Sequence, residues 1–294
     1  MIIKKGKMWM GGISLDSLYL NDLKVDSLVD LLKATYTLED WDKMIEISDK
    51  LYQTTQESEE NVKIKRSSCE RHIVYYVGYS QLMKGIALQN KGQYSEAKEL
   101  IDNYSDLSWL EDGSKEASKE VSFFNMFAKA NLLAVNVLEG NLEYLDPYVQ
   151  FLRESRLDEL MPGLLNIIDS SLKNDFEIDD LLASFKIEMN RAMDYYKHKR
   201  ALYIMKVLNK LSIYYLARKH YHIAIDTILQ GLEFSNLLSD TRAFRKFTII
   251  FESIRNKTSE DQQLRYSSMI HQLLKEELSH EKNISFRDGS FLPA

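Results

Sequence analysis

The chain has 294 residues, with 44 acidic and 38 basic side chains, a formal net charge of −6 and a pI near 5.6. This balance argues against direct binding of nucleic acid, because contacts to phosphates need a basic face. With three prolines and eleven glycines, and apolar residues at helical spacing, the sequence predicts an all-α protein.

Cysteine usage and the first residues bear on the cellular compartment. Cys69 is the single cysteine, which excludes an intramolecular disulfide and fits a reducing environment. The start, MIIKKGKMWMGG, has lysines but lacks the apolar core of a secretory signal. No apolar run reaches the roughly 18 residues of a membrane span. We expect a cytoplasmic protein with no membrane contact.

The N-terminal part predicts an extension followed by a helical pair. Residues 1–13 form the extension, and the pair runs from Ser14 to Tyr52. A break at residues 37–40 separates its two helices, and Asp40 has the type of side chain that caps a helix N-terminus. The polar segment 53–68 is predicted to be a helix end and a loop.

The next segment carries the clearest repeat signal. Helices are expected over residues 71–90 and 95–104, joined by a turn. The residues at the spacing of one helical-hairpin repeat are Gly85, Leu88, Gly92, Tyr94 and Ala97. Small residues at these positions let two helices approach closely. A hairpin of this kind cannot bury its apolar face alone, so it predicts neighbouring hairpins.

Four further pairs follow along the chain. Residues 123–138 lead to a turn at Gly140-Asn141 and a returning helix with Pro147 in its first turn. The other predicted pairs are 157–172 with 178–193, 196–216 with 222–237, and 242–255 with 259–280. A tail covers residues 283–294.

An internal match supports the repeat. Aligning Tyr94 with Tyr221 brings Gly85 onto Ser212 and Ala97 onto Ala224. The anchors Trp41, Tyr94 and Leu142 are 53 and 48 residues apart, longer than the tetratricopeptide period of about 34. The sequence therefore predicts a tetratricopeptide-like (TPR-like) helical-hairpin solenoid over residues 14–282. We expect five or six hairpins in a right-handed superhelix without a sheet.

Motifs that would carry chemistry are weak or missing. His220 and His222 are two residues apart, so on a helix they point in different directions. A basic run of Lys197, Lys199, Arg200 and Lys206 is typical of a solvated helix face. The sequence has no phosphate-binding loop and no metalloprotease motif. We expect no catalytic residues, no metal and no cofactor.

The segment RHIVYYVGYSQLMKGIALQNKGQYSEAKELI, followed by DLSWL and AKANLLAVNVLEG, resembles part of a known group of regulators. These are regulators from Bacillus and related Gram-positive bacteria, including the Rap-, PlcR- and NprR-type receptors of secreted signalling peptides. The resemblance covers roughly Asp40 to Leu238 and concerns their repeat-containing half. Many of these regulators carry a helix-turn-helix DNA-binding domain before the array, and the segment before the first pair here does not resemble one.

The resemblance implies a function in quorum sensing and transcription regulation. We expect a non-enzymatic regulatory binding protein, the sensor or adaptor of a peptide-responsive system, with a short signalling peptide or a partner protein as its ligand. One alternative is a Rap-like modulator of a response-regulator phosphorelay. Another is a plain protein–protein assembly scaffold, and a homodimer is left open.

The peptide would bind on the concave face, which the first helix of each pair lines in this repeat type. Amide side chains suit an extended peptide because each can donate to a C=O and accept from an N–H. A lysine could meet a peptide carboxylate. The positions predicted to bind the peptide are Tyr79, Gln89, Asn90, Asn125, Asn131, Asn136, Lys206 and Asn209.

Overall fold

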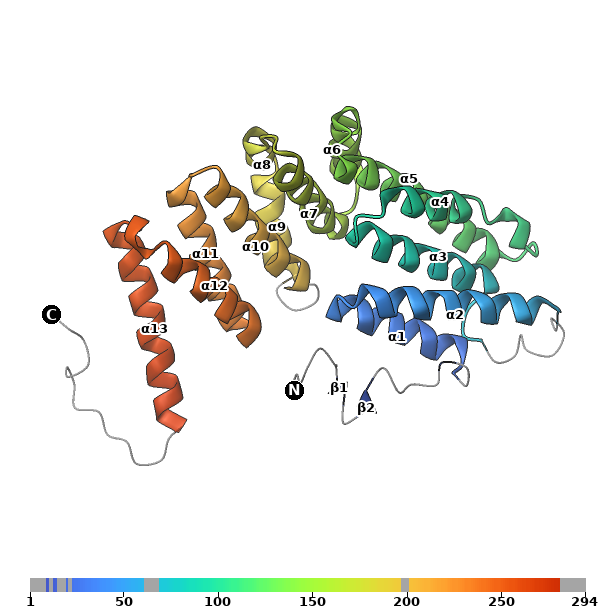
Figure 1. The fold of residues 1–294 in the computed structure, drawn as a ribbon, viewed down its shortest axis with the longest axis horizontal. Coiled ribbons are helices and arrows are strands. Elements are labelled where there is room, and N and C mark those ends of the chain that lie inside the picture. Colours follow the sequence, from blue (N-terminus) through green and yellow to red (C-terminus); the bar gives the residue numbers. More distant parts are fainter. Residues whose placement is uncertain are drawn as a thin grey trace. The chain divides into compact units, whose positions relative to one another are not determined.

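The computed structural model describes residues 9–10, 13–14, 20, 23–60, 69–196 and 201–280 (Figure 1). Almost all of the chain within these ranges is helical, so the all-α class is confirmed. The exception is an antiparallel pair of two-residue strands, β1 (Trp9–Met10) and β2 (Ile13–Ser14). The predicted absence of any sheet fails at this short pair. Most of the predicted extension and the predicted tail lie outside the described residues.

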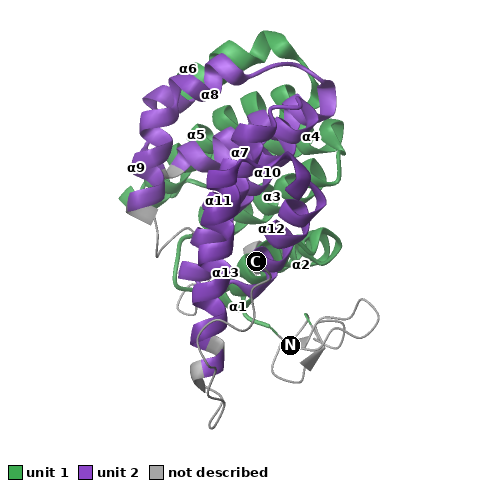
Figure 2. Cartoon of the chain, turned by 90° about the vertical axis from the view of Figure 1, so that its left-hand side faces the viewer, with its two compact units in different colours: residues 1–151 green, residues 152–294 purple. Residues whose placement is uncertain are grey.

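The chain divides into two compact units, residues 1–151 and 152–294 (Figure 2). Helix α6 (Leu145–Glu154) contains the boundary between them. The single repeat domain over residues 14–282 stays a prediction, and each unit is described by itself.

Unit 1 is a series of helices in which each packs against the next. Its helices are α1 (Val25–Leu38), α2 (Trp41–Glu60), α3 (Ile73–Asn90), α4 (Tyr94–Ser105) and α5 (Lys115–Glu139), with the 3-10 turns η4 (Ser108–Leu110) and η5 (Leu142–Tyr144). The predicted cap is confirmed, because the Asp40 carboxylate accepts from the backbone N–H of Lys43 at 3.1 Å. Helix α2 continues to Glu60, further into the polar segment than the apolar pattern indicates.

In unit 2, α10 packs against α7, α9 and α11, and α11 also packs against α12 and α13. The bounds are α7 (Leu157–Asn174), α8 (Asp179–Ser184), α9 (Lys186–Tyr196), α10 (Ala201–Ala217), α11 (Tyr221–Leu237), α12 (Thr241–Ser253) and α13 (Glu260–His280), with the 3-10 turn η6 (Arg255–Lys257). The prediction of one helix over 178–193 is wrong. The helix is interrupted at the buried Phe185, which separates α8 from α9.

The two matched hairpins share one turn geometry. In the first, the N–H of Gln93 donates to the C=O of Leu88 at 2.9 Å, and Gly92 has a φ of 77°. In the second, the N–H of His220 donates to the C=O of Tyr215 at 2.9 Å, and the residue before it has a φ of 60°. Both turns have the 6→1 bond and left-handed residue of a Schellman C-cap. The sequence alignment therefore pairs structurally equivalent positions.

Helices α3 and α10 are each surrounded by other helices of their unit, so their side chains are buried on several sides. Polar groups on these helices bond locally: the Ser80 hydroxyl donates to the C=O of Val77 at 2.7 Å, and the Ser212 hydroxyl to that of Leu208 at 2.8 Å. The fully buried Tyr214 uses its hydroxyl to accept from the backbone N–H of Ile178 at 3.0 Å. These bonds satisfy polar groups that burial would otherwise leave unpaired.

Helix α5 is long and apolar enough to pass a length-and-composition test for a membrane span, alone among the described helices. Buried helices of protein cores pass the same test. Phe124 and Ala128 on α5 are buried, and the helix packs against α3 and α4. The composition of α5 is therefore not an argument for a span.

Two glycines of α3 offer a matched test of its packing. A Cβ at Gly78 would lie 2.5 Å from ring carbons of Phe124, whose side chain is fully buried, whereas a Cβ at Gly85 would lie 3.8 Å from Leu100. We expect Gly78→Ala to lower the free energy of unfolding by about 1–3 kcal/mol through overpacking. Gly85→Ala should raise it by about 0.5–1 kcal/mol, because alanine loses less backbone entropy in a helix. Urea denaturation measures both, and equal midpoints would contradict this account.

Candidate functional site

Unit 1 gathers charged and aromatic side chains where α1, α3 and α5 approach one another. The "unit 1 face" denotes Lys33 on α1, Arg71 just before α3, Tyr75 and Tyr79 on α3, and Glu120 on α5. These elements belong to the first helices of successive predicted pairs, which are the helices predicted to line the peptide-binding face.

Arg71 connects the parts of this face. Its guanidinium carbon lies 3.6 Å from the centroid of the Tyr75 ring, and its Nη2 donates to the Glu120 carboxylate. Glu120 is 5% exposed, while the Arg71 side chain is 45% exposed. A buried carboxylate therefore fixes a guanidinium that still reaches solvent. Such charge-assisted bonds are stronger than neutral ones.

The aromatic rings continue the face along α3. Tyr75 and Tyr79 are stacked, with centroids 5.3 Å apart and an interplanar angle of 17°. Burial raises the pKa of Tyr75, while the positive charges of Arg71 and Lys33 act in the opposite direction. The Tyr75 hydroxyl is therefore neutral at physiological pH. Tyr75 is buried, so the accessible part of the face is the half-buried Tyr79 ring and the exposed guanidinium of Arg71. Tyrosine and arginine side chains are enriched at protein interfaces.

The chain before α3 is anchored by its neighbours, which positions Arg71. The hydroxyl of Tyr76 accepts from the backbone N–H of Arg71 at 3.1 Å and donates to the Asp26 carboxylate of α1. His72 caps α3, because its Nδ1 accepts from the N–H of Val74 at 3.3 Å. Its Nε2 lies 3.3 Å from an Asp112 oxygen. Bonds from Ser114, with a smaller effect of His72, hold the pKa of Asp112 well below its usual range.

Three predicted site residues lie on α3. Tyr79 is half-buried and belongs to the unit 1 face. Gln89 is half-buried, and Asn90 is exposed at the C-terminal end of the helix, where its Nδ2 donates to the C=O of Ile86 at 2.8 Å. Of the predicted positions, the structure thus brings Tyr79 into the charged and aromatic cluster.

The amide side chains of α5 that were predicted to bind a peptide form hydrogen bonds within the protein instead. Nδ2 of Asn125 donates to the C=O of Ser105 at 2.9 Å, and Nδ2 of Asn131 donates to the Tyr104 hydroxyl at 2.9 Å. Asn136 is buried, and its Nδ2 donates to the C=O of Leu132 at 2.8 Å. Asn125 and Asn131 thus turn toward α4 and its C-terminal end. A peptide would have to displace existing bonds to use these donor groups.

Lys206 and Asn209 lie on α10 in unit 2, so the predicted positions are divided between the two units. Lys206 is half-buried. Asn209 is 6% exposed, and its Nδ2 has no hydrogen-bond partner among the residues that the structure describes. Lys197, Lys199 and Arg200 of the basic run lie outside those residues.

His220 and His222, which the sequence places two residues apart, have different neighbours. Nδ1 of His220 is 3.9 Å from Asp179, and Nδ1 of His222 is 3.2 Å from Asp226. No group of three or more His, Cys, Asp or Glu side chains within the described ranges is placed to hold a metal ion.

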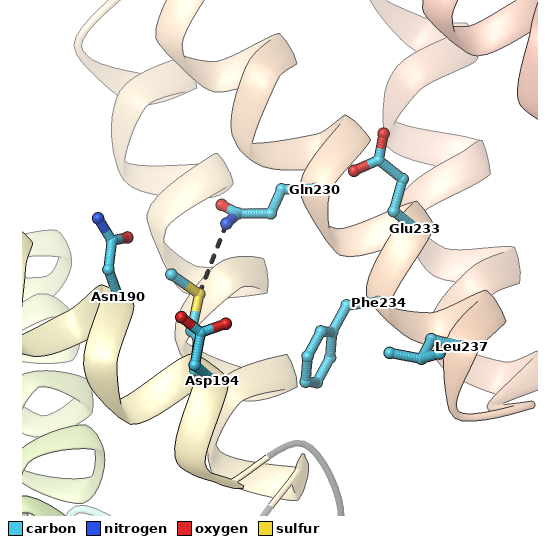
Figure 3. A pocket seen from close by; sticks show the side chains of 7 residues that line it. Asn190, Asp194, Gln230, Glu233, Phe234 and Leu237 are labelled. Carbon is cyan, nitrogen blue, oxygen red and sulfur yellow. Dashed lines mark hydrogen bonds between the residues drawn. The ribbon is translucent and has the colours of Figure 1, made fainter.

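Sequence reasoning missed two features of the molecule. Arg71 and Glu120 are 49 residues apart, and no spacing rule links them. The second feature is a pocket of unit 2 between α9 and α11 (Figure 3). None of the eight predicted positions lines it.

Comparisons of the chain with protein-family models, with curated proteins and with solved structures find no match.

The ion pair of the unit 1 face has a measurable structural role. Arg71→Met keeps an aliphatic stem but leaves the Glu120 carboxylate buried without its partner. We expect the free energy of unfolding to fall by about 1–3 kcal/mol. Lys84→Met is the matched control, because it breaks a more exposed pair with Asp49 (Nζ–Oδ1 2.6 Å) and should cost less than about 1 kcal/mol. Equal losses in denaturant titrations would count against a special role for Glu120.

The buried amide of Asn209 gives a test with the opposite sign. Asn209→Leu removes a donor that has no partner in the described part of the chain, so we expect stabilisation by about 1 kcal/mol. Asn131→Leu should instead destabilise by a similar amount, because it removes the bond to Tyr104. Thermal unfolding distinguishes the two, and loss of stability in Asn209→Leu would show that its amide is satisfied.

Proposed function

We propose that the chain is a non-enzymatic binding protein of TPR-like helical-repeat architecture that holds a short peptide or a segment of a partner protein. The observation that carries this proposal is the arrangement of Arg71 and Tyr79 on the unit 1 face, where the buried Tyr75 ring supports both side chains. Arginine and tyrosine supply much of the binding energy at protein interfaces, because both combine a large contact area with directional hydrogen bonds. The Glu120 carboxylate holds the arginine in place before a ligand arrives, which lowers the entropy cost of binding.

We further propose that the protein is the cytoplasmic sensor or adaptor of a peptide-responsive regulatory system. Support for this role comes from the resemblance of residues 71–101 to the repeat half of Bacillus-type receptors. The geometry shared by the hairpin turns at Gly92 and Lys219 is consistent with an array of TPR-like hairpins in a right-handed superhelix. The net charge of −6 favours a peptide or protein over nucleic acid as direct ligand.

Selection from a displayed library of short peptides on the full chain tests binding at the unit 1 face. We expect enriched peptides whose affinity falls about tenfold, or about 1.4 kcal/mol, in Tyr79→Ala and in Arg71→Met. Leu142→Ala is the control. This exposed apolar residue lies in η5, after the C-terminal end of α5, whereas Arg71 contacts α5 near its N-terminal end. Peptides whose affinity is the same for wild type and both face variants would place the binding surface elsewhere.

The same preparation separates the alternatives. Release of phosphate from phosphorylated response regulators, with turnover, would favour a Rap-like modulator. Failure of every peptide to raise the melting temperature, together with stable assembly with a folded partner, would favour a scaffold. A ligand that binds the native state alone raises apparent stability, so the thermal assay is a direct readout.

A further inference from the structure

Helix α5 carries a strip of apolar side chains that reach solvent. The "α5 strip" denotes Phe123, Met126, Phe127 and Ala130, which follow one another at helical spacing and so lie on one side of α5. Phe123 is 39% exposed and Met126 is 52% exposed, whereas Phe127 and Ala130 are half-buried. Apolar side chains that are exposed next to one another, rather than singly, mark interaction surfaces.

Other sides of α5 are used for packing within unit 1, where the helix lies against α3 and α4 (Figure 1). Phe124 and Ala128 are buried, and the Phe124 ring packs against α3 at Gly78. On another side, Nδ2 of Asn125 donates to the C=O of Ser105 at the end of α4. The α5 strip occupies the side that these contacts leave.

The aromatic rings of the α5 strip are held in place by the residues beneath them. The ring centroids of Phe123 and Phe127 are 4.4 Å apart, and the edge of Phe123 meets the buried Phe124 ring at 5.5 Å. Phe127 in turn packs against the core of unit 1. The exposed ring of Phe123 is thus positioned before a ligand arrives, which reduces the entropy cost of binding. Met126 beside it is flexible and can adapt to the shape of a ligand.

Lysines flank the α5 strip along the helix. Lys119 and Lys115 lie about one and two turns before Phe123, and Lys129 lies three residues after Met126. All three lysines are exposed, and none forms an ion pair with a residue that the structure describes. Their charges are therefore available to a ligand that packs on the strip.

The acidic residues of α5 balance these lysines only in part. Glu120 is paired with Arg71, and Glu139 is paired with Lys98. Glu116 remains as the acidic side chain of α5 that has no ion pair within the described residues. Two copies of the chain that met through this strip would double the excess of positive charge, and like charges at an interface are unfavourable. A segment with carboxylates beside its apolar residues complements the strip instead.

We propose that the α5 strip binds an amphipathic helix of a partner protein that is rich in glutamate or aspartate. Apolar side chains of that helix pack on Phe123 and Met126, and its carboxylates meet the three lysines. A helix fits because the strip runs along α5, as apolar ridges do where two helices pack. The strip shares no residue with the unit 1 face, so this inference goes beyond the function proposed for that face.

The methyl group of Met126 provides a local probe in the full chain. Methyl-labelled methionine is introduced, and Met126→Leu assigns the signal. The ligand is a blocked peptide of about 18 residues, long enough to form a helix, with leucines at i, i+3, i+4 and i+7 and glutamates beside them. We expect a saturable shift of the Met126 signal. A peptide with glutamine in place of glutamate, and one with alanine in place of leucine, should each bind about tenfold more weakly.

Variants of the protein then test the two halves of the surface by calorimetry. Lys119→Glu should weaken the glutamate peptide about tenfold, whereas Lys275→Glu, at an exposed lysine of α13, should leave its affinity unchanged. Met126→Ser should also weaken binding about tenfold, with Leu264→Ser at another exposed apolar residue as its control. An unmoved Met126 signal, equal binding of the glutamate and glutamine peptides, or unchanged affinity in Lys119→Glu would each overturn the proposal.

Three further measurements distinguish other occupants of the α5 strip. Vesicles of phosphatidylcholine and phosphatidylserine that shift the Met126 signal as the peptide does would assign the strip to a membrane surface. A shift that depends on protein concentration without peptide would assign it to a second copy. Either result would overturn the proposal. Tyr79→Ala should leave the titration unchanged, and a loss equal to that of Met126→Ser would place the peptide on the unit 1 face instead.

Discussion

Burial of α3 and α10 on several sides is the constraint on which the rest of each unit depends. A helix without a polar face is stable in water when other helices cover it. In unit 1, α2, α4 and α5 supply the cover, and in unit 2, α7, α9 and α11 do. Close approach requires a small residue at Gly78, where the Phe124 ring packs against α3. The helices thus pack in this way because the apolar surfaces of α3 and α10 must be kept out of water.

The same constraint shapes the unit 1 face. Because α3 is covered by its neighbours, few of its side chains reach solvent, and those of Tyr79 and Asn90 are among them. The N-terminal end of the helix carries the polar cluster, where bonds to Asp26 and Glu120 attach the chain to α1 and α5. Packing and binding chemistry are therefore coupled. A change that loosens the helix also moves the arginine.

Much of the fold is predictable from the sequence because periodicity and capping are local. The predicted helices 71–90 and 95–104 agree with α3 and α4 to within two residues, and the cap at Asp40 is present. The break at Phe185 is not predictable, since an apolar residue there continues the helical pattern. The candidate site is harder to predict from the sequence, because Arg71 and Glu120 come together only in the tertiary fold. In the sequence, Asn125 and Asn131 are typical of ligand-binding amides, yet in the structure both donate hydrogen bonds to residues of α4.

Two buried tyrosines attach irregular backbone to the core. The hydroxyl of Tyr76 accepts from the N–H of Arg71, and that of Tyr214 accepts from the N–H of Ile178. Each of these amides lies ahead of a helix, yet its protection depends on a side chain within α3 or α10. Exchange of these two amides with deuterium would then report detachment of a connecting segment from the core, a local opening that can occur while the helices stay folded. Exchange at Arg71 would therefore measure how firmly the Tyr76 hydroxyl holds the residues just before α3.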